Sequence, residues 1–369
     1  MARVAYIGTG HVVEAIHLPA LARVRNVTLT GGYDLSAQQR QTWERVTRTP
    51  GYASVDELFD RAKPDVVVVA TPPDSHVEGC VRALEFGAHV ICEKPIASSV
   101  LEADQIASAA ASSGRAVAVN HHFRYQPIFS AIKTAVDSRR FGEPTFCQIS
   151  QLMDLPPWDE PTAWRAAMAH HSLLESGIHF VDLLLHLFGT LPREVAYHRS
   201  AGPGGPGTAE AVQLLTLDFG DGRLAQLTID RLCRAATRYG ELRLDCTDAS
   251  LRASIGGRML LRIGKERAAR AGVRVDYGRA GLAWYERGLR RGVLARNPVR
   301  AEIPATARLI SEALDAFAAG RRPPSDLAQA RTALTVIEAA YRFADGNSPR
   351  GAADAAEWSE PHGNPRTSA

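Results

Sequence analysis

Two apolar runs on either side of a helical segment most constrain the fold of this chain. Residues 65–71 (DVVVVAT) and 88–92 (AHVIC) are continuous apolar runs, typical of strands that a parallel sheet buries on both faces. Between them, residues 75–86 have helical spacing with the apolar side chains on one side, and Gly87 follows as a stop signal. This strand, helix, strand unit predicts an open α/β sheet that binds ligands at the carboxyl ends of its strands.

The N-terminal segment predicts a dinucleotide site on the same sheet. Residues 4–7 form a strand that runs directly into Gly8-Thr9-Gly10-His11-Val12-Val13. Gly8 permits a tight turn, and Gly10 lets a pyrophosphate approach the amides at a helix N-terminus. The third position is Val13 where glycine or alanine is usual, so the pattern is weak until its context is added.

Asp34 supplies that context and a cofactor preference. It ends a second strand, residues 27–33, at the spacing at which an acid hydrogen-bonds the ribose hydroxyls of the adenosine. A carboxylate there repels the 2′-phosphate of NADP, and the following Leu35 and Ser36 add no cation. The sequence favours NAD, while Arg40 is the nearest cation and keeps NADP open.

Composition limits the class of protein. The chain has 369 residues, 45% apolar and 22% charged, which is ordinary for a globular protein of two domains. A formal charge of +3 predicts no nucleic-acid partner, and five cysteines without a CxxC pair fit a reducing cytoplasm. No run reaches membrane-spanning length, and a strand near the N-terminus leaves no room for a signal peptide, so we expect a cytoplasmic protein.

Lys94 is one of only four lysines in a chain that otherwise uses arginine. It lies in Glu93-Lys94-Pro95, directly after the strand at residues 88–92. A lysine in a partly desolvated cleft can exchange protons with a substrate hydroxyl, which arginine cannot readily do. The alternative is a solvated lysine in a turn.

A second set of chemical groups lies on the segment 173–189, which predicts one helix ending at Gly189. Glu175 and His179 are four residues apart and share a face, and His186 lies near that face. A carboxylate and an imidazole can therefore face one cleft. The alternative is a satisfied histidine at the edge of the core.

The rest of the chain predicts a second domain. Alternating segments at 194–199, 211–219, 223–229, 241–244 and 251–255 predict strands, with a flexible Gly-Pro connector at 202–207. We expect an N-terminal Rossmann domain with a doubly wound parallel sheet (1–122), a C-terminal α+β domain with a large, mainly antiparallel open sheet (123–345), and a disordered tail (346–369).

These motifs resemble the Gfo/Idh/MocA family of nicotinamide-dependent oxidoreductases. The matching segments are Gly8-Thr9-Gly10, His17-Leu18-Pro19-Ala20-Leu21, Asp34, Thr71-Pro72-Pro73 with His76, Glu93-Lys94-Pro95, Arg124-Tyr125-Gln126-Pro127, Trp164-Arg165 and Glu175 to His179, and residues 310–345 look like the closing helices. The resemblance implies that His179 is the general base, that Lys94 relays the proton, and that Glu175 supports both. It also implies a homodimer or homotetramer through the open sheet face.

The expected site follows from these motifs. Cofactor-binding residues are Gly8, Thr9, Gly10, His11, Val12, Asp34, Thr71, Pro72, Pro73, His76, Glu93, Lys94 and Asn120; substrate-binding residues are Lys94, His122, Arg124, Trp164, Arg165, His170, His171 and His179. The substrate class is a sugar, amino sugar or cyclitol hydroxyl. Alternatives are an NADP-dependent ketoreductase of a nucleotide-linked keto sugar and a non-catalytic nucleotide-binding sensor.

Two departures from the family pattern concern the pocket. Glutamate stands at 175 where aspartate is usual, and Ala169-His170-His171-Ser172 replaces a glycine-rich loop. The two histidines either narrow the pocket or face water. Segment 258–300 carries twelve Lys or Arg against three acids, which predicts a solvated basic face or, alternatively, a site for an anionic substrate. No HExxH-like spacing is present, so we expect no metal.

Overall fold

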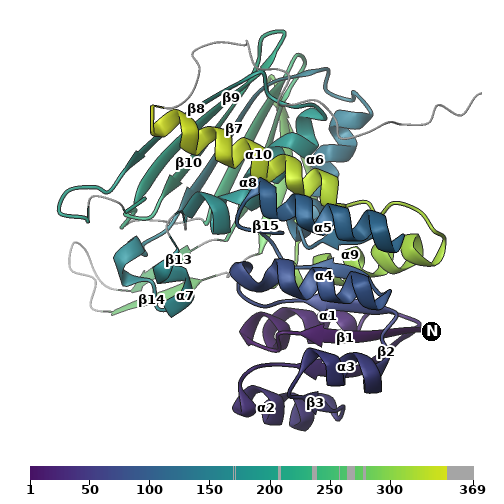
Figure 1. The fold of residues 1–369 in the computed structure, drawn as a ribbon. Helices are drawn as coiled ribbons and strands as arrows, with labels where there is room; N and C mark the ends of the chain where they lie inside the picture. The colour runs from purple at the N-terminus through teal and green to yellow at the C-terminus, as the bar shows by residue number, and fades with distance from the viewer. Residues whose placement is uncertain are drawn as a thin grey trace, which may run out of the picture.

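The computed structural model describes residues 1–168, 170, 172–206, 209–234, 239–256, 258–263, 271–276 and 280–346. They confirm the predicted fold class, a parallel Rossmann sheet followed by a large, mainly antiparallel sheet (Figure 1). His171, the tail from residue 347 and parts of the connector and of the basic segment 258–300 lie outside the described residues. No helix in the described part is long and apolar enough to cross a membrane.

The N-terminal sheet has six parallel strands in the order β3-β2-β1-β4-β5-β6. The strands are β1 (Ala2–Ile7), β2 (Val27–Tyr33), β3 (Gly51–Tyr52), β4 (Val66–Val69), β5 (His89–Cys92) and β6 (Val117–Val119). The helical segments are the π-turn η1 (Val13–His17), α1 (Leu18–Leu21), α2 (Ala37–Thr47), α3 (Val55–Ala62), the short turn η2 (Pro73–Ser75), α4 (His76–Phe86) and α5 (Val100–Ser113).

Both faces of this sheet are covered, as continuous apolar strands require. Along β1 successive residues point to opposite faces. Val4 belongs to the core cluster that contains Ile310, whereas Ala5 belongs to the cluster that contains Leu84 and Ile106. The carboxyl ends of the strands, where Gly8 and Glu93 follow, are therefore held by a core on either side.

The second sheet has eight strands in the order β16-β15-β12-β11-β7-β10-β9-β8. Only the β7–β10 pair is parallel among the described pairs. The strands are β7 (Pro144–Leu152), β8 (Glu194–Ser200), β9 (Val212–Gly220), β10 (Arg223–Asp230), β11 (Gly240–Cys246), β12 (Ser250–Ile255), β15 (Gly281–Arg287) and β16 (Arg290–Asn297); β13 (Arg258–Ile263) and β14 (Ala271–Asp276) form a separate pair. The sequence patterns had not indicated β7, β15 or β16.

Helices lie on one face of this large sheet (Figure 1). They include α6 (Pro127–Asp137), α8 (Ile178–Phe188) and α10 (Leu327–Ala344); the short turns η3 (His122–Tyr125), η4 (Pro157–Asp159), η5 (Ser172–Gly177) and helix α7 (Ala163–Ala167) connect the strands. The predicted helix 173–189 is thus a π-turn, η5, continued by α8.

The closing helices join the two sheets. Helix α9 (Glu302–Ala318) places Ile310 and Phe317 in the core cluster of β1 and β4. Helix α10 contacts α5 of the first domain and α8 and β8 of the second. The segment that ends the second domain in sequence therefore also completes the core of the first.

Candidate active site

The glycine turn after β1 leaves room for a phosphate group. Gly8 has φ +87°, and a Cβ there would meet the backbone of Ala70 and Thr71 at 2.8 Å. Gly10 differs, because a Cβ there would meet nothing within 4 Å. Gly8 thus serves the turn, and the open space lies at Gly10. The helix that follows begins as the π-turn η1, a local geometry often found at functional sites.

Asp34 is fixed at the end of β2. Its Oδ2 accepts hydrogen bonds from Thr9 N at 2.9 Å and Thr9 Oγ1 at 3.1 Å, and Oδ1 accepts one from Ser36 N at 2.9 Å. Arg40 donates from Nη1 to the carbonyls of Asp34 at 2.7 Å and Leu35 at 3.0 Å. The Asp34 carboxylate is therefore held beside the glycine turn, and the Arg40 guanidinium is hydrogen-bonded to the adjoining backbone.

The loop after β4 is held by His76. This side chain is 0% exposed, with Nδ1 2.7 Å from Pro95 O and Nε2 2.8 Å from Thr71 O. Burial lowers the pKa of His76, against the effect of its two carbonyl partners. His76, which we expected to bind cofactor, is thus placed to tie the Thr71 loop to the turn after Lys94.

The polar atoms on this side fit a dinucleotide. Within the described chain, the buried Thr71 Oγ1 and Asn120 Oδ1 have no hydrogen-bond partner, so the hydroxyl can donate to or accept from a bound group and the amide oxygen can accept from one. Together with the open space at Gly10 and the fixed Asp34, they suit a bound NAD(P) at the carboxyl edge of the sheet.

Glu93 joins three segments beneath this edge. Its Oε1 accepts from Asn120 Nδ2 at 2.6 Å and lies 2.6 Å from His17 Nε2, and its Oε2 accepts from Lys94 N at 3.2 Å. Burial alone would raise the pKa of Glu93, but the bonds to His17 and Asn120 and the charge of Lys94 hold it well below its usual range. Glu93 is therefore a buried carboxylate, and sequence reasoning had given His17 no role.

Lys94 crosses from the first domain to the second. Its Nζ donates to Glu175 O at 2.7 Å and to Glu175 Oε1 at 2.9 Å. The same Oε1 accepts from Arg165 Nη2 at 3.2 Å, and the Arg165 guanidinium lies over the Trp164 ring at 4.6 Å. The expected pairing of Lys94 with Glu175 is present, and Arg165 joins it.

His179 lies one turn beyond Glu175 against aromatic rings. It stacks on Phe123 with ring centroids 4.5 Å apart and contacts His122 edge-on at 4.7 Å and His121 at 6.3 Å. His121 and His122 follow Asn120, which bonds Glu93. These ring contacts fix the plane of the imidazole.

Arg124 has a different place from the one expected. Its Nε donates to Asp182 Oδ2 at 2.7 Å, Nη2 donates to Asp182 Oδ1, and Nη1 donates to Gln329 Oε1 at 2.6 Å. Asp182 is 0% exposed, and Arg124 keeps its pKa low despite burial. With all three nitrogens bound to protein groups, Arg124 holds the core beneath α8, and its contact with substrate stays a prediction.

His170 also contacts other side chains of the protein. Its ring lies 3.9 Å from the Tyr341 ring, and its Nδ1 lies 3.3 Å from Glu210 Oε1. Glu210 is buried and also accepts from Arg199 Nη1 at 3.1 Å and Tyr341 Oη at 3.2 Å. His170 therefore packs against Tyr341 and Glu210 while its side chain is 41% exposed.

Sequence reasoning missed several of these partners. Asp182 was detectable, because Glu175, His179 and Asp182 form a polar stripe on an otherwise apolar helix. Glu160, Arg231 and Glu210 offered no local signal, since their partners lie far away in sequence. Among the described residues, no group of three or more His, Cys, Asp or Glu side chains is arranged to hold a metal ion.

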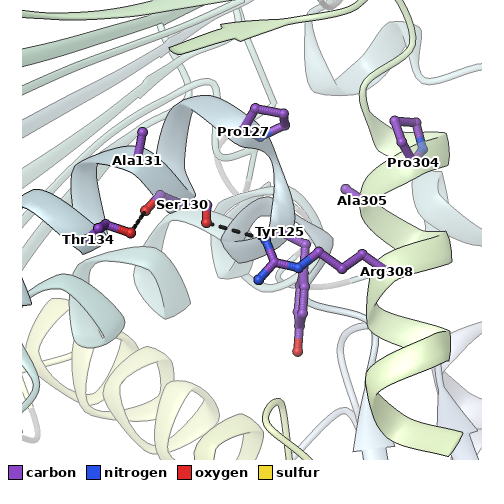
Figure 2. Close-up of a pocket in the computed structure, with 8 residues that line it drawn as sticks. All are labelled: Tyr125, Pro127, Ser130, Ala131, Thr134, Pro304, Ala305 and Arg308. Carbon is purple, nitrogen blue, oxygen red and sulfur yellow. Dashed lines mark hydrogen bonds between the residues drawn. The ribbon is translucent and has the colours of Figure 1, made fainter. Parts of the chain in front are cut away.

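A surface pocket between α6 and α9 lies outside this site (Figure 2). Its lining residues are Tyr125, Pro127, Ser130, Ala131, Thr134, Pro304, Ala305 and Arg308. Arg308 reaches across it to donate to Ser130 Oγ at 3.4 Å. None of the proposed catalytic residues lines this pocket.

Alanine at the two glycines of the turn should have different effects, one on stability and the other on NADH binding. Gly8→Ala should destabilise the fold by about 1–3 kcal/mol, because alanine resists a positive φ and its Cβ meets backbone. Gly10→Ala should keep the stability of the native protein but weaken NADH binding, because the new methyl group enters the open space. Thermal unfolding and NADH fluorescence titration check both. Unchanged NADH affinity in Gly10→Ala would place the pyrophosphate elsewhere.

Comparison with known proteins agrees with this geometry. Residues 2–121 match the family model described as "Oxidoreductase family, NAD-binding Rossmann fold", and residues 129–252 match "GFO/IDH/MocA C-terminal domain". An oxidoreductase from Agrobacterium radiobacter, solved with NAD+, L-tartaric acid and magnesium, has a TM-score of 0.79 at 17% identity over 95% of this chain and 98% of its own. At that identity the likeness concerns the fold.

Two curated relatives come from Bacillus subtilis (strain 168). Glucose-6-phosphate 3-dehydrogenase is 27% identical over 51% of this chain and 54% of its own length, so the chain spans about half of that protein. The protein named scyllo-inositol 2-dehydrogenase (NADP(+)) is 27% identical over 66% of this chain and 82% of its own length. Because both family models match in order along most of the chain, the chain belongs to the Gfo/Idh/MocA family of oxidoreductases and carries its NAD-binding Rossmann domain.

Proposed function

We propose that this protein is an NAD-dependent dehydrogenase that oxidises a secondary hydroxyl of a sugar, amino sugar or cyclitol. The observation that carries the proposal is the contact of Lys94 Nζ with Glu175 at 2.7 and 2.9 Å, which joins the cofactor domain to the helix of His179. The names of the two relatives, which describe a sugar phosphate dehydrogenase and an inositol dehydrogenase, support the substrate class.

The chemistry divides between the cofactor and the side chains. Bound nicotinamide supplies the hydride acceptor. His179 takes the hydroxyl proton as general base, because an imidazole nitrogen can accept a proton and its ring is held by Phe123. Lys94 hydrogen-bonds the same oxygen, stabilises the charge that develops there and relays the proton. Glu175 holds the Lys94 ammonium in place and is itself held by Arg165.

One observation favours a second candidate, an NADP(H)-dependent ketoreductase of a nucleotide-linked keto sugar. Arg40 Nη1 donates to the carbonyl oxygen of Asp34 at 2.7 Å. Its guanidinium therefore lies close to the residue that we expect to hydrogen-bond the adenosine ribose. A guanidinium suits a phosphate, whereas the Asp34 carboxylate repels it. We favour NAD because the Asp34 carboxylate is fixed by Thr9 and Ser36 and cannot readily turn away.

The cofactor preference is testable by titration. We expect the wild-type protein to bind NADH at least about tenfold more tightly than NADPH, because like charges in close contact are disfavoured. Asp34→Ser should remove most of that difference, while the exposed Asp60→Asn serves as a matched control in the same domain. Tighter NADPH binding by the wild type would favour the ketoreductase.

The catalytic assignment is tested with Lys94→Met and His179→Ala. A panel of glucose 6-phosphate, glucose, glucosamine and scyllo-inositol is first screened for NADH formation. On the best substrate, each variant should lose about 10²–10⁴-fold in turnover while binding NADH normally, because a general acid or base contributes about that much. Lys133→Met and the exposed His198→Ala are the matched controls. Full turnover in both site variants would contradict the assignment of these residues, whereas a wild type that turns over none of the substrates would favour a non-catalytic sensor.

The open face of the large sheet is the proposed subunit interface. Residues opposite one another across seven strands form a row on this face: Val293, Trp284, Arg252, Arg243, Gln148, Gln226 and Thr216. Guanidiniums lie over aromatic rings here, with Arg243 5.2 Å from Phe146 and Arg291 4.7 Å from Trp284. Arginine and aromatic side chains are enriched in interface cores, so we propose a homodimer formed by this face.

Light scattering after size exclusion tests this interface. The wild type should be at least a dimer, and Arg243→Glu/Arg252→Glu should shift it to monomer because four new carboxylates then meet across the two-fold axis. Arg25→Glu/Arg45→Glu, on the exposed surface of the first domain, is the control. A monomeric wild type, or a charge-reversed variant that stays dimeric, contradicts the proposal.

A further inference from the structure

Arg231 is a buried arginine directly after β10, with three hydrogen bonds to residues near Arg165 and Glu175 in sequence. It is 2% exposed. Its Nε donates to Leu155 O at 2.8 Å, Nη1 to Ser172 Oγ at 3.2 Å and Nη2 to Glu160 Oε2 at 3.1 Å. The side chains of Arg231 and Glu160 are 3% and 6% exposed, so the ion pair is shielded from water.

Two of these partners lie in the segment that carries Arg165, and the third begins the turn that carries Glu175. Leu155 and Glu160 belong to residues 153–168, which leave β7 and carry α7, and Ser172 begins the π-turn of Glu175. Backbone bonds already hold the first part of the segment, since Met153 N donates to Asp230 O at 2.8 Å and Leu155 N to Arg231 O at 3.1 Å. Arg231 adds the bonds to Glu160 and to Ser172.

Within the described residues, helix α7 places none of its own side chains in the core, although Met168 directly after it packs there. It has five residues, none of them buried, and its N-terminus has no side-chain cap. A helix this short does not stand by itself in water. Yet Arg165 on this helix donates to Glu175 Oε1 at 3.2 Å, the oxygen that also binds Lys94. The position of Arg165 therefore depends on contacts that fix the segment from outside.

We propose that the Arg231–Glu160 pair is a clamp that positions residues 156–168, and with them Trp164 and Arg165, against Glu175. Arg231 is a positioning residue in this proposal, because it acts on the site through Arg165. The effect on activity rests on the proposed dehydrogenase function, whereas the effect on the segment does not. A buried ion pair adds little to net stability but defines one geometry, which is what a substrate-facing segment needs.

Hydrogen exchange read by mass spectrometry tests the clamp without turnover. In Arg231→Met, and in the milder Glu160→Gln, amide exchange of residues 156–168 should rise at least about tenfold while α8 and the first domain keep wild-type exchange. Arg231→Lys should restore part of the protection, since an ammonium can still reach Glu160. Arg234→Met is the matched control, because the neighbouring Arg234–Asp154 pair has 76% and 45% exposed side chains.

Steady-state kinetics test the consequence for the site. Arg231→Met should raise KM about tenfold, with a smaller fall in kcat and unchanged NADH affinity, because substrate contacts are misplaced. Arg165→Ala should raise KM similarly without raising exchange in the segment, and the double variant should be no worse than Arg165→Ala alone.

The outcomes separate the two proposals. Wild-type exchange of 156–168 in Arg231→Met and Glu160→Gln would overturn the clamp, as would exchange that rises equally throughout both domains and is not restored by Arg231→Lys. A wild-type protein with no turnover on any substrate would instead count against the dehydrogenase, and the exchange result would still decide the clamp.

Discussion

The arrangement of the site depends on the hydrogen bonds of the buried Glu93 carboxylate. One oxygen binds Asn120 and His17, both at 2.6 Å, and the other accepts from the amide of Lys94. His17 comes from the turn that follows the glycine loop, and Asn120 follows β6. A charge this buried is costly unless every lone pair is used, so the three segments have one favourable arrangement. The direction in which Lys94 leaves β5 follows from that arrangement.

The second domain places side chains that contact one another opposite the carboxyl edge of the first sheet. Lys94 and Arg165 share one oxygen of Glu175, and Phe123 and His122 hold the ring of His179. Neither domain alone contains all of these side chains. Helix α9 also links the two domains, because it follows the large sheet in sequence and packs on β1 and β4. The distance from Lys94 to the helix of His179 is thus determined by the packing of the whole chain.

Local signals predicted the parts of this structure that depend on local physics. Helix α4 lies within one residue of its predicted bounds because Gly87 ends it, and Asp34 lies at the end of β2 because strand and turn patterns are short-range. Contacts over long separations were not predictable. His17 meets Glu93 across 76 residues, and Arg231 meets Glu160 across 71. The π-turn before α8 was hidden because its apolar spacing resembles an ordinary helix. For the same reason, Arg124 and His170 looked available for substrate, since their partners Asp182 and Glu210 are distant in sequence.

The contrast between lysine and arginine in this chain follows from geometry. Arg124 and Arg231 each use all three nitrogens on fixed protein partners, which suits a planar group with donors in fixed directions. Lys94 has a compact ammonium that bonds a carbonyl and a carboxylate of the same residue and has a third proton to donate. A guanidinium at position 94 would spread its charge over a plane and could not give up a proton near neutral pH. At position 94 the compact ammonium fits between the carbonyl and the carboxylate of Glu175, which is the contact that carries the proposed dehydrogenase function.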